Sequence, residues 1–507
     1  MRRTSAVSDE QLIIIGAGVA GLAAGCYACM NGYDVRIFEM HTLPGGMCTS
    51  WRRKDYVFDY CIHNLAGTAP ESDVRRVWDE LGALDETRII NHDSFVRIEG
   101  PGGESLEWYT RLDRLAQHLN GIAAEDSRTI DELIQSARRL VGADVFALQL
   151  GGMARSLGML TRMPTVRRWS RVKLGQFAER FRNPFLRRAL PHMQYDIPGA
   201  EVPMLAPLMF MAGFESGDLG WPVGGSLAFS RRIEKRYLDL GGVLHYKAKV
   251  EKIMVEDDRA VGIRLADGTE HRADRIISAA DGYSTIFKML DGRYLNETIR
   301  QYYNEVGDSS PFGYIMFLGL EGELPREPFG EGHALTLIFD KPLDLGEIEQ
   351  DSIHVVGFGP ETGLTPEGRS ILKIEGQARY PYWKSLHDTD PQAYIAEKER
   401  VAGVIIQRIS PWFPMLEDRV EVMNISTPPT VERFTGNRYG WQAGPPKENA
   451  AEIMRKGLSR TLPGLERFHM VGQWASAQLG ISSVAIQARS FIKGLCRQAR
   501  KRFVVNG

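Results

Sequence analysis

Residues 11–46 read QLIIIGAGVAGLAAGCYACMNGYDVRIFEMHTLPGG, and this stretch decides the fold. The apolar run 12–15 predicts a short strand that breaks into the glycine turn 16–21. Small apolar residues follow at helical spacing, and 34–38 then predict a second strand that ends at Glu39. A strand, a glycine turn, a helix and a second strand with an acid at its tip form a dinucleotide-binding unit.

Each glycine of the turn has a physical reason. Gly16 permits the tight turn, Gly18 lets the backbone approach a pyrophosphate at the helix N-terminus, and Gly21 lets the helix pack close to the sheet. Glu39 stands where a carboxylate accepts hydrogen bonds from ribose hydroxyls. A second glycine pair, Gly45-Gly46, follows soon after this acid, and an extended FAD needs such a close approach where a simple NAD unit does not. The spacing therefore favours FAD over NAD.

The whole chain limits the class of protein. Its 507 residues suffice for two or three domains, and a formal net charge of -2 gives no global field that attracts nucleic acid. Five cysteines form an odd, sparse set, which is typical of a reducing compartment. No apolar run is long enough to cross a bilayer, and acids interrupt the basic N-terminus before any signal-like segment. We expect a cytoplasmic protein, with peripheral membrane attachment as an option.

The nucleotide-binding domain is predicted to be discontinuous. It takes 1–100, 221–290 and 455–507, because strand-like runs with hairpin turns at 243–281 and a final strand and helix after 468 complete it. Residues 101–220 predict a helical cap, and 291–454 a substrate domain with a mixed sheet. The expected fold is thus α/β, with a Rossmann-type FAD domain, an α+β substrate domain and a cap. The glycines at 357–359 are read as a hairpin connection, since Pro360 and a further strand follow them.

Several motifs together indicate a family. Besides the N-terminal unit these are WPVGG from Trp221, ADRIISAAD at 273–281, YGW at 439–441 and FHMVGQWASAQLGISSVAIQARS at 468–490. With them the chain resembles the phytoene desaturase-like flavoproteins, a group with carotenoid desaturases, carotenoid isomerases and retinol saturase. The likeness covers nearly the whole length and implies the glutathione reductase-like or amine oxidase-like superfold. It specifies no substrate.

The resemblance implies a set of FAD contacts. The backbone of Val250 would hold the adenine side, Gly472 and Gln473 would lie by the ribityl-diphosphate arm, and Ile481 and Ser482 would open the last helix against the flavin ring. These residues join Gly16, Gly18, Gly21, Glu39, Gly45 and Gly46. The positive end of a helix beside the ring stabilises a reduced, anionic flavin. Met47 stands where many relatives in the wider group have Arg.

Catalytic candidates are few, because a flavin itself carries out hydride transfer. His63 follows the glycine pair at a distance that returns the chain toward the ring, as an acid or base or as a structural histidine. Trp221 and Trp474 are candidates for stacking on substrate or flavin, with core packing as the alternative. Cys48 and Cys61 are weighed as flavin attachment points. No metal site is predicted.

Residues 155–188 hold ten basic residues from Arg155 to Arg188 and one acid, Glu179. Apolar side chains recur between the charges at helical spacing, in one set from Phe146 to Leu160 and a second set from Leu174 to Phe185. Such a segment suits either an anionic membrane surface or a helical cap with solvated arginines.

These patterns predict an FAD-dependent oxidoreductase that desaturates, saturates or isomerises a long apolar lipid such as an isoprenoid or polyene. The alternatives are an amine oxidase of the same superfold, and a prenyl-lipid carrier of the GDP-dissociation-inhibitor type. Intact Glu39 and Gly45-Gly46 argue against the carrier.

Overall fold

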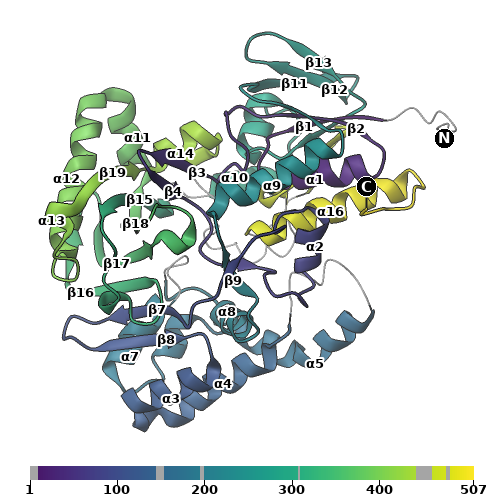
Figure 1. Ribbon diagram of the computed structural model, residues 1–507. Helices are drawn as coiled ribbons and strands as arrows, with labels where there is room; N and C mark the ends of the chain where they lie inside the picture. Colours follow the sequence, from purple (N-terminus) through teal and green to yellow (C-terminus); the bar gives the residue numbers. More distant parts are fainter. Residues whose placement is uncertain are drawn as a thin grey trace.

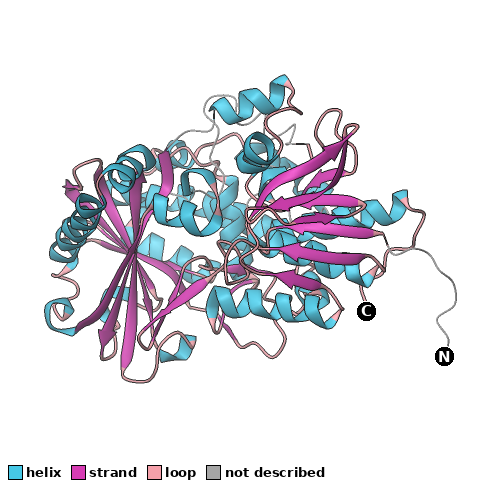
Figure 2. Cartoon of the chain, turned by 90° about the horizontal axis from the view of Figure 1, so that it is seen from above, coloured by secondary structure: helices cyan, strands magenta, loops and turns pink. Residues whose placement is uncertain are grey.

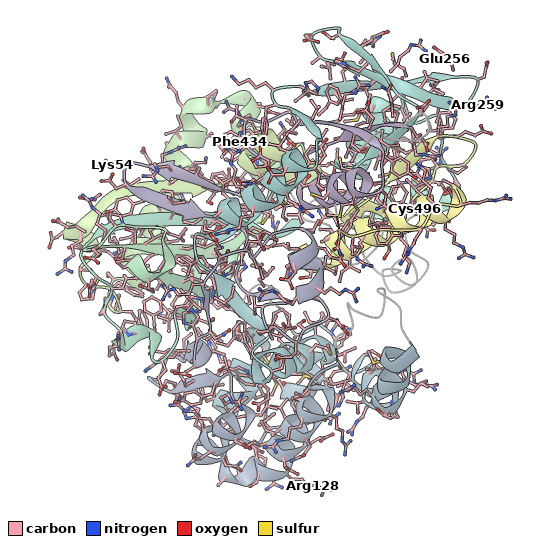
Figure 3. The ribbon with its side chains drawn as sticks, turned by 45° about the vertical axis from the view of Figure 1, so that its right-hand side comes forward. Lys54, Arg128, Glu256, Arg259, Phe434 and Cys496 are labelled. Atoms are coloured by element: carbon pink, nitrogen blue, oxygen red, sulfur yellow. The ribbon has the colours of Figure 1, made fainter. Side chains whose placement is uncertain are left out.

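A computed structural model describes residues 10–143, 153–193, 199–305, 309–440, 459–475 and 480–506. Two sheets dominate it and lie on opposite sides of the middle of the molecule (Figures 1 and 2). Helices of the 101–220 region form a third part below them, so that Arg128 lies at one end of the molecule and Glu256 and Arg259 at the other (Figure 3).

The first sheet is parallel and has five strands in the order β10-β2-β1-β14-β20. In chain order these are β1 (Gln11–Ile15), β2 (Asp34–Phe38), β10 (Val243–His245), β14 (Arg275–Ser278) and β20 (Phe468–Met470). Segments from both ends of the chain therefore build one sheet. The strand, helix and strand predicted from 11–38 are confirmed.

Two helices from opposite ends of the chain pack side by side on this sheet. α1 (Val19–Met30) is buried nearly all round, which explains its run of small apolar residues, and it contacts α16 (Ile481–Gln498) and α9 (Gly225–Asp239). Beside the sheet lies an antiparallel layer of β11 (Val250–Glu256), β12 (Arg259–Leu265) and β13 (Glu270–Arg272).

The second sheet has seven strands in the order β19-β15-β18-β17-β16-β7-β8. They are β7 (Ser94–Glu99), β8 (Ser105–Tyr109), β15 (Ser309–Glu321), β16 (Ala334–Asp344), β17 (Glu349–Phe358), β18 (Arg369–Arg379) and β19 (Val420–Ser426). β7 pairs with β16 in parallel and the other neighbours are antiparallel, so the sheet is mixed. The hairpin expected at 357–359 joins β17 to β18.

The β7–β8 hairpin crosses the expected boundary at residue 100. Because β7 forms its ladder with β16, this hairpin belongs to the second sheet and not to the nucleotide-binding unit. On its outer side that sheet is covered by α11 (Tyr380–Thr389), α12 (Pro391–Ile409) and α13 (Leu416–Arg419), whereas α14 (Pro428–Thr435) contacts α11 and faces the nucleotide-binding unit.

The remaining helices occupy most of the region 101–220. They are α3 (Leu112–Ile122), α4 (Ser127–Leu140), α5 (Met153–Trp169), α6 (Leu174–Ala178), α7 (Pro184–Ala189) and α8 (Leu205–Glu215). α2 (Arg75–Glu80) and α10 (Glu297–Glu305) lie outside this region. Short strands bridge the parts: β3 (Ser50–Arg53) with β4 (Tyr56–Asp59), and β9 (Leu219–Pro222) between β5 (Leu65–Ala66) and β6 (Ile89–Ile90).

Candidate functional site: a cavity between the two sheets

The glycine turn presents unoccupied backbone donors at the N-terminus of α1. Gly16 has a φ of +96°, and a Cβ on Gly21 would stand 2.0 Å from the carbonyl oxygen of Gly16, so the helix approaches the turn too closely for a side chain. Gly18 is the N-cap, with no side-chain capping bond, and the first turn of α1 holds no acid. The free N–H groups and the helix dipole therefore provide a binding site for an anion.

Glu39 ends β2 next to this turn. Its carboxylate accepts hydrogen bonds from the backbone N–H groups of Ala17 (2.7 Å) and His41 (2.8 Å), which orient it. The side chain is only 7% exposed, and burial raises the pKa of Glu39 even though these amides oppose the shift. Each carboxylate oxygen keeps a second lone pair for a ligand hydroxyl.

The second glycine pair closes over the first turn. The N–H of Gly45 donates to the carbonyl of Ala17 at 2.8 Å, and Gly45 also forms a backbone bridge with Gly18. Gly45 and Gly46 have φ values of +102° and +62°, and a Cβ on Gly45 would stand 2.1 Å from the carbonyl oxygen of Cys48. Only glycine fits the tight turn at position 45.

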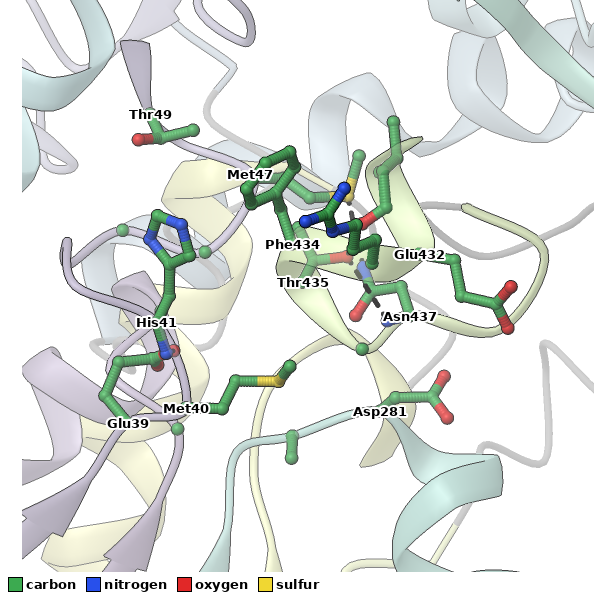
Figure 4. A pocket seen from close by; sticks show the side chains of 18 of the residues that line it. Glu39, Met40, His41, Met47, Thr49, Asp281, Glu432, Phe434, Thr435 and Asn437 are labelled. Carbon is green, nitrogen blue, oxygen red and sulfur yellow. Dashed lines mark hydrogen bonds between the residues drawn. The ribbon is translucent and has the colours of Figure 1, made fainter. Parts of the chain in front are cut away.

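A cavity of about 1090 Å³ begins at this turn and extends between the two sheets. Figure 4 shows Glu39 and His41 on one wall and Phe434 and Asn437, from the end of α14 and the residues after it, on the other. Among the predicted cofactor contacts, those that line it are Gly16, Gly18, Glu39, Gly45, Gly46, Val250, Gly472, Gln473 and Ile481. Gly21 and Ser482 are not among the lining residues; Ser482 donates to the carbonyl of Ala66 at 3.1 Å.

The closing segment of the chain meets the cavity through another uncapped helix. α16 begins at Ile481 after Gly480, which makes no side-chain capping bond, and its first turn holds no acid. Trp474 also lines the cavity, at 7% exposure, and stands beside Gly472, whose φ is +92°. Two helix N-termini from opposite ends of the sequence thus face one space.

The other two catalytic candidates lie outside the cavity wall. Trp221 is buried, and its indole N–H donates to the carbonyl of Ile62 at 3.1 Å. His63 is half-buried; its Nε2 lies 3.0 Å from a carboxylate oxygen of Glu375 and 2.9 Å from Nζ of Lys373. Nζ of Lys373 also lies 2.8 Å from Glu375 and donates to the carbonyl of Tyr60, a cavity residue, at 3.1 Å.

Lys373 and Glu375 were not found from the sequence. They alternate along β18 with Leu372 and Ile374, which pack in the core on the other face of the sheet, so both charges point toward the nucleotide-binding side. Burial alone would raise the pKa of Glu375, but the adjacent His63 and Lys373 outweigh it, and the pKa falls below its ordinary value. The carboxylate is therefore ionised, and it forms an ion pair with Lys373 beside the half-buried His63. Alternating charges inside a strand are the only signal that sequence offered.

The basic segment 155–188 is more fully paired than its composition suggests. Ion pairs join Arg168 and Arg180 to Glu132, Lys173 to Glu201 and Arg188 to Asp340. In the second apolar set Leu174, Phe177 and Phe181 are buried in the core, and Phe185 is half-buried. α7 starts at Pro184, with Asn183 capping it.

The apolar set from Phe146 to Leu160 is only partly visible. Phe146 and Leu150 lie outside the described residues, whereas Leu160 is 64% exposed and Met163 43% exposed on α5. Across the described ranges, the chain has no helix with both the length and the apolar character to span a bilayer.

Geometry and donor set together fit FAD. The uncapped N–H groups of α1 lie where they would bind a diphosphate, and Glu39, at the end of the neighbouring strand, lies where it would bind a ribose. The uncapped N-terminus of α16 faces another part of the same cavity. The volume matches the upper end of small-molecule pockets, as an extended dinucleotide requires.

Comparison with known proteins agrees with the fold. Residues 14–81 match the model of the NAD(P)-binding Rossmann-like domain. The chain is 24% identical to a chloroplastic prolycopene isomerase of Arabidopsis thaliana over 96% of its own length and 82% of the relative. It is 23% identical to a zeta-carotene-forming phytoene desaturase of Myxococcus xanthus, covering 96% and 94% of the two chains. An all-trans-retinol 13,14-reductase of Danio rerio is 22% identical, over 87% of this chain and 79% of the relative.

Solved structures share the fold. An oxidoreductase from Methanosarcina mazei superposes with a TM-score of 0.64 at 16% identity, covering 95% of this chain and 100% of that one. A putrescine oxidase superposes with a TM-score of 0.61 at 15% identity, covering 96% of this chain and 99% of that one. The α/β Rossmann-type fold and the resemblance inferred from the motifs are thus confirmed, and the chain is similar over nearly its whole length to a prolycopene isomerase and a phytoene desaturase.

Proposed function

We propose that the protein is an FAD-dependent oxidoreductase that acts on C–C or C=C bonds of a long apolar isoprenoid or polyene, by desaturation, saturation or isomerisation. The observation that carries the proposal is the cavity, which joins the glycine turn, the second glycine pair and the N-terminus of α16. The relatives named above are enzymes of carotenoid and retinoid chemistry and match nearly the whole chain.

FAD would supply hydride transfer, and the chain's residues would bind and orient it. The amides of Gly18 and the first turn of α1 would hold the diphosphate, Glu39 the adenosine ribose, and the backbone of Val250 the adenine side. Gly472 and Gln473 would lie by the ribityl arm. The N-terminus of α16 at Ile481 would face the ring, where its dipole stabilises negative charge and so favours hydride acceptance.

An apolar substrate would bind against the second sheet. Trp51 lines the cavity and packs edge-to-face on Phe317 of β15, with ring centroids 5.4 Å apart, and Phe317 in turn stacks on Phe58 at 5.0 Å. Phe317 and Phe58 are fully buried behind Trp51, so the indole of Trp51 would be the apolar surface that a polyene contacts.

His63 remains our candidate for proton transfer. Lysine has only hydrogen-bond donors, and an ionised carboxylate has only acceptors. Nε2 of His63 therefore has a partner in either form: without a proton it accepts from Lys373, and with a proton it donates to Glu375. These partners would thus let His63 gain or lose a proton without reorganisation. Its test is the pH profile of turnover, which Glu375→Gln should shift and which Glu251→Gln, on the exposed side of β11, should leave unchanged.

Membrane delivery of the substrate is a second part of the proposal. The exposed Leu160 and Met163 share α5 with Arg162 and Arg167 and would insert at an anionic bilayer surface. Co-sedimentation with phosphatidylserine vesicles tests this: Leu160→Ser with Met163→Ser should reduce the bound fraction, and equal binding of the variant would contradict the assignment.

Flavin reoxidation tests the reaction class. The holoenzyme is reduced anaerobically and mixed with a carotenoid, a retinoid or an aliphatic amine in detergent; the converse experiment follows bleaching of oxidised flavin. We expect the polyenes to change the flavin spectrum, with new double-bond isomers or altered saturation in the extracted lipid. Bleaching by the amine alone would overturn the proposal in favour of C–N oxidation.

A further inference from the structure

Two cysteines face one another across the hairpin that leads from the second glycine pair. β3 and β4 pair antiparallel with Ser50 opposite Asp59, and the N–H of Tyr60 donates to the carbonyl of Thr49 at 3.1 Å, which carries the register one step further. Cys48 and Cys61 are the next residues on the two sides, just beyond the end of the ladder, and their side chains are hydrogen-bonded to each other. Two adjacent thiols are the arrangement from which a disulfide forms.

Both thiols are in the cofactor cavity. Cys48 and Cys61 line it together with Gly45, Gly46 and Met47. Cys48 is 4% exposed and its Sγ lies 3.6 Å from the carbonyl of Ser226, whereas Cys61 is half-buried. Burial raises the pKa of the Cys48 thiol well above its ordinary value, and a hydrogen bond with Cys61 raises it further, as expected of adjacent sulfurs. Cys61, the more accessible sulfur, is therefore the attacking nucleophile.

We propose that Cys48 and Cys61 are a redox-active dithiol that forms a reversible disulfide and exchanges two electrons with the cofactor of this cavity. The inference rests on the proposed FAD. When the disulfide forms, both S–H bonds break and one S–S bond forms, so that two protons and two electrons leave the sulfurs. Oxidised FAD would accept both electrons together with one proton, and the second proton would pass to solvent. Reduction of the disulfide reverses each change. Disulfides of proteins in reducing compartments are typically of this transient, catalytic or sensing kind.

The two cysteines of α1, which lie away from the cavity, provide a control. Cys26 and Cys29 are three residues apart on α1, and neither is a lining residue of the cavity. Burial raises the pKa of Cys29 to about 12, so it stays protonated. Cys29→Ser should therefore leave the cavity dithiol intact.

Electron counting tests the proposal independently of substrate. The holoenzyme is oxidised with diamide, freed of oxidant and titrated anaerobically with dithionite while flavin absorbance is followed. We expect two electron pairs per flavin in the wild type and in Cys29→Ser, and one pair in Cys61→Ser and Cys48→Ala. Peptide mapping of the oxidised protein should find Cys48 and Cys61 linked, lighter by two hydrogen atoms.

Two results together would overturn the dithiol: flavin-containing wild type takes up only one electron pair, and both cysteines still react with an alkylating reagent after diamide. The proposed function would then still stand. Purified protein without flavin would instead defeat the proposed function, and peptide mapping alone would then decide whether the disulfide forms.

Discussion

Glu39→Ala tests the nucleotide end of the site. The buried carboxylate is oriented by the N–H groups of Ala17 and His41, and its remaining lone pairs would accept the two hydroxyls of the adenosine ribose. Hydrogen bonds to a charged group contribute about 1.5–3 kcal/mol each, so two of them amount to about 3–6 kcal/mol of FAD affinity. Since each 1.4 kcal/mol is tenfold, the Kd should rise by about 10² to 10⁴.

The assay is flavin content after purification, followed by fluorescence titration of the apoprotein with FAD. Glu39→Gln keeps one acceptor oxygen and the side-chain volume, so its FAD affinity should lie between those of the wild type and Glu39→Ala. Glu270→Ala, which removes an exposed acid of β13 that is not among the lining residues of the cavity, should bind FAD as the wild type does. An unchanged Kd for Glu39→Ala, in protein whose circular dichroism matches the wild type, would refute the ribose contact.

Three further changes test the structure. Gly21→Ala places a Cβ 2.0 Å from a backbone carbonyl and should abolish flavin retention, whereas Gly403→Ala, in open space on α12, should raise Tm slightly; equal flavin content in both would contradict the close approach. Arg489 of α16 places its Nε 2.6 Å from the carboxylate of Glu80, and Glu80→Gln removes that charge. The free energy of unfolding, measured with denaturant, should fall by about 3–5 kcal/mol, and a fall below about 1 kcal/mol would count against a buried ion pair. Burial raises the pKa of Glu347 to about 7, so the folded state binds the extra proton and stability falls as pH rises from about 4.5 through 7; Glu347→Gln should flatten the Tm profile over that window, and parallel profiles would contradict it.

The nucleotide-binding unit could be predicted because its determinants are local. The glycine turn, the helix after it and the acid at Glu39 lie within one short stretch, and each has a steric or electrostatic reason at its own position. The start of the last helix at Ile481 was instead implied by the family resemblance, and the structure places it there.

The second sheet and the ion pair beside His63 could not be predicted in the same way. β7 pairs with β16, more than 200 residues away along the chain, and no local pattern specifies that partner. Lys373 and Glu375 read as an ordinary polar alternation in a strand, and only the fold buries them beside His63. Trp221 shows the converse: its motif marked it as a site residue, yet its side chain fills the core and bonds to Ile62.

Whether the protein carries FAD is decided by releasing and identifying the bound cofactor. We expect the purified protein to be yellow, and heat or acid to release one FAD per chain, identified by mass spectrometry, with loss of the yellow colour from the protein. A colourless protein that binds a nicotinamide dinucleotide with higher affinity than FAD would contradict this expectation.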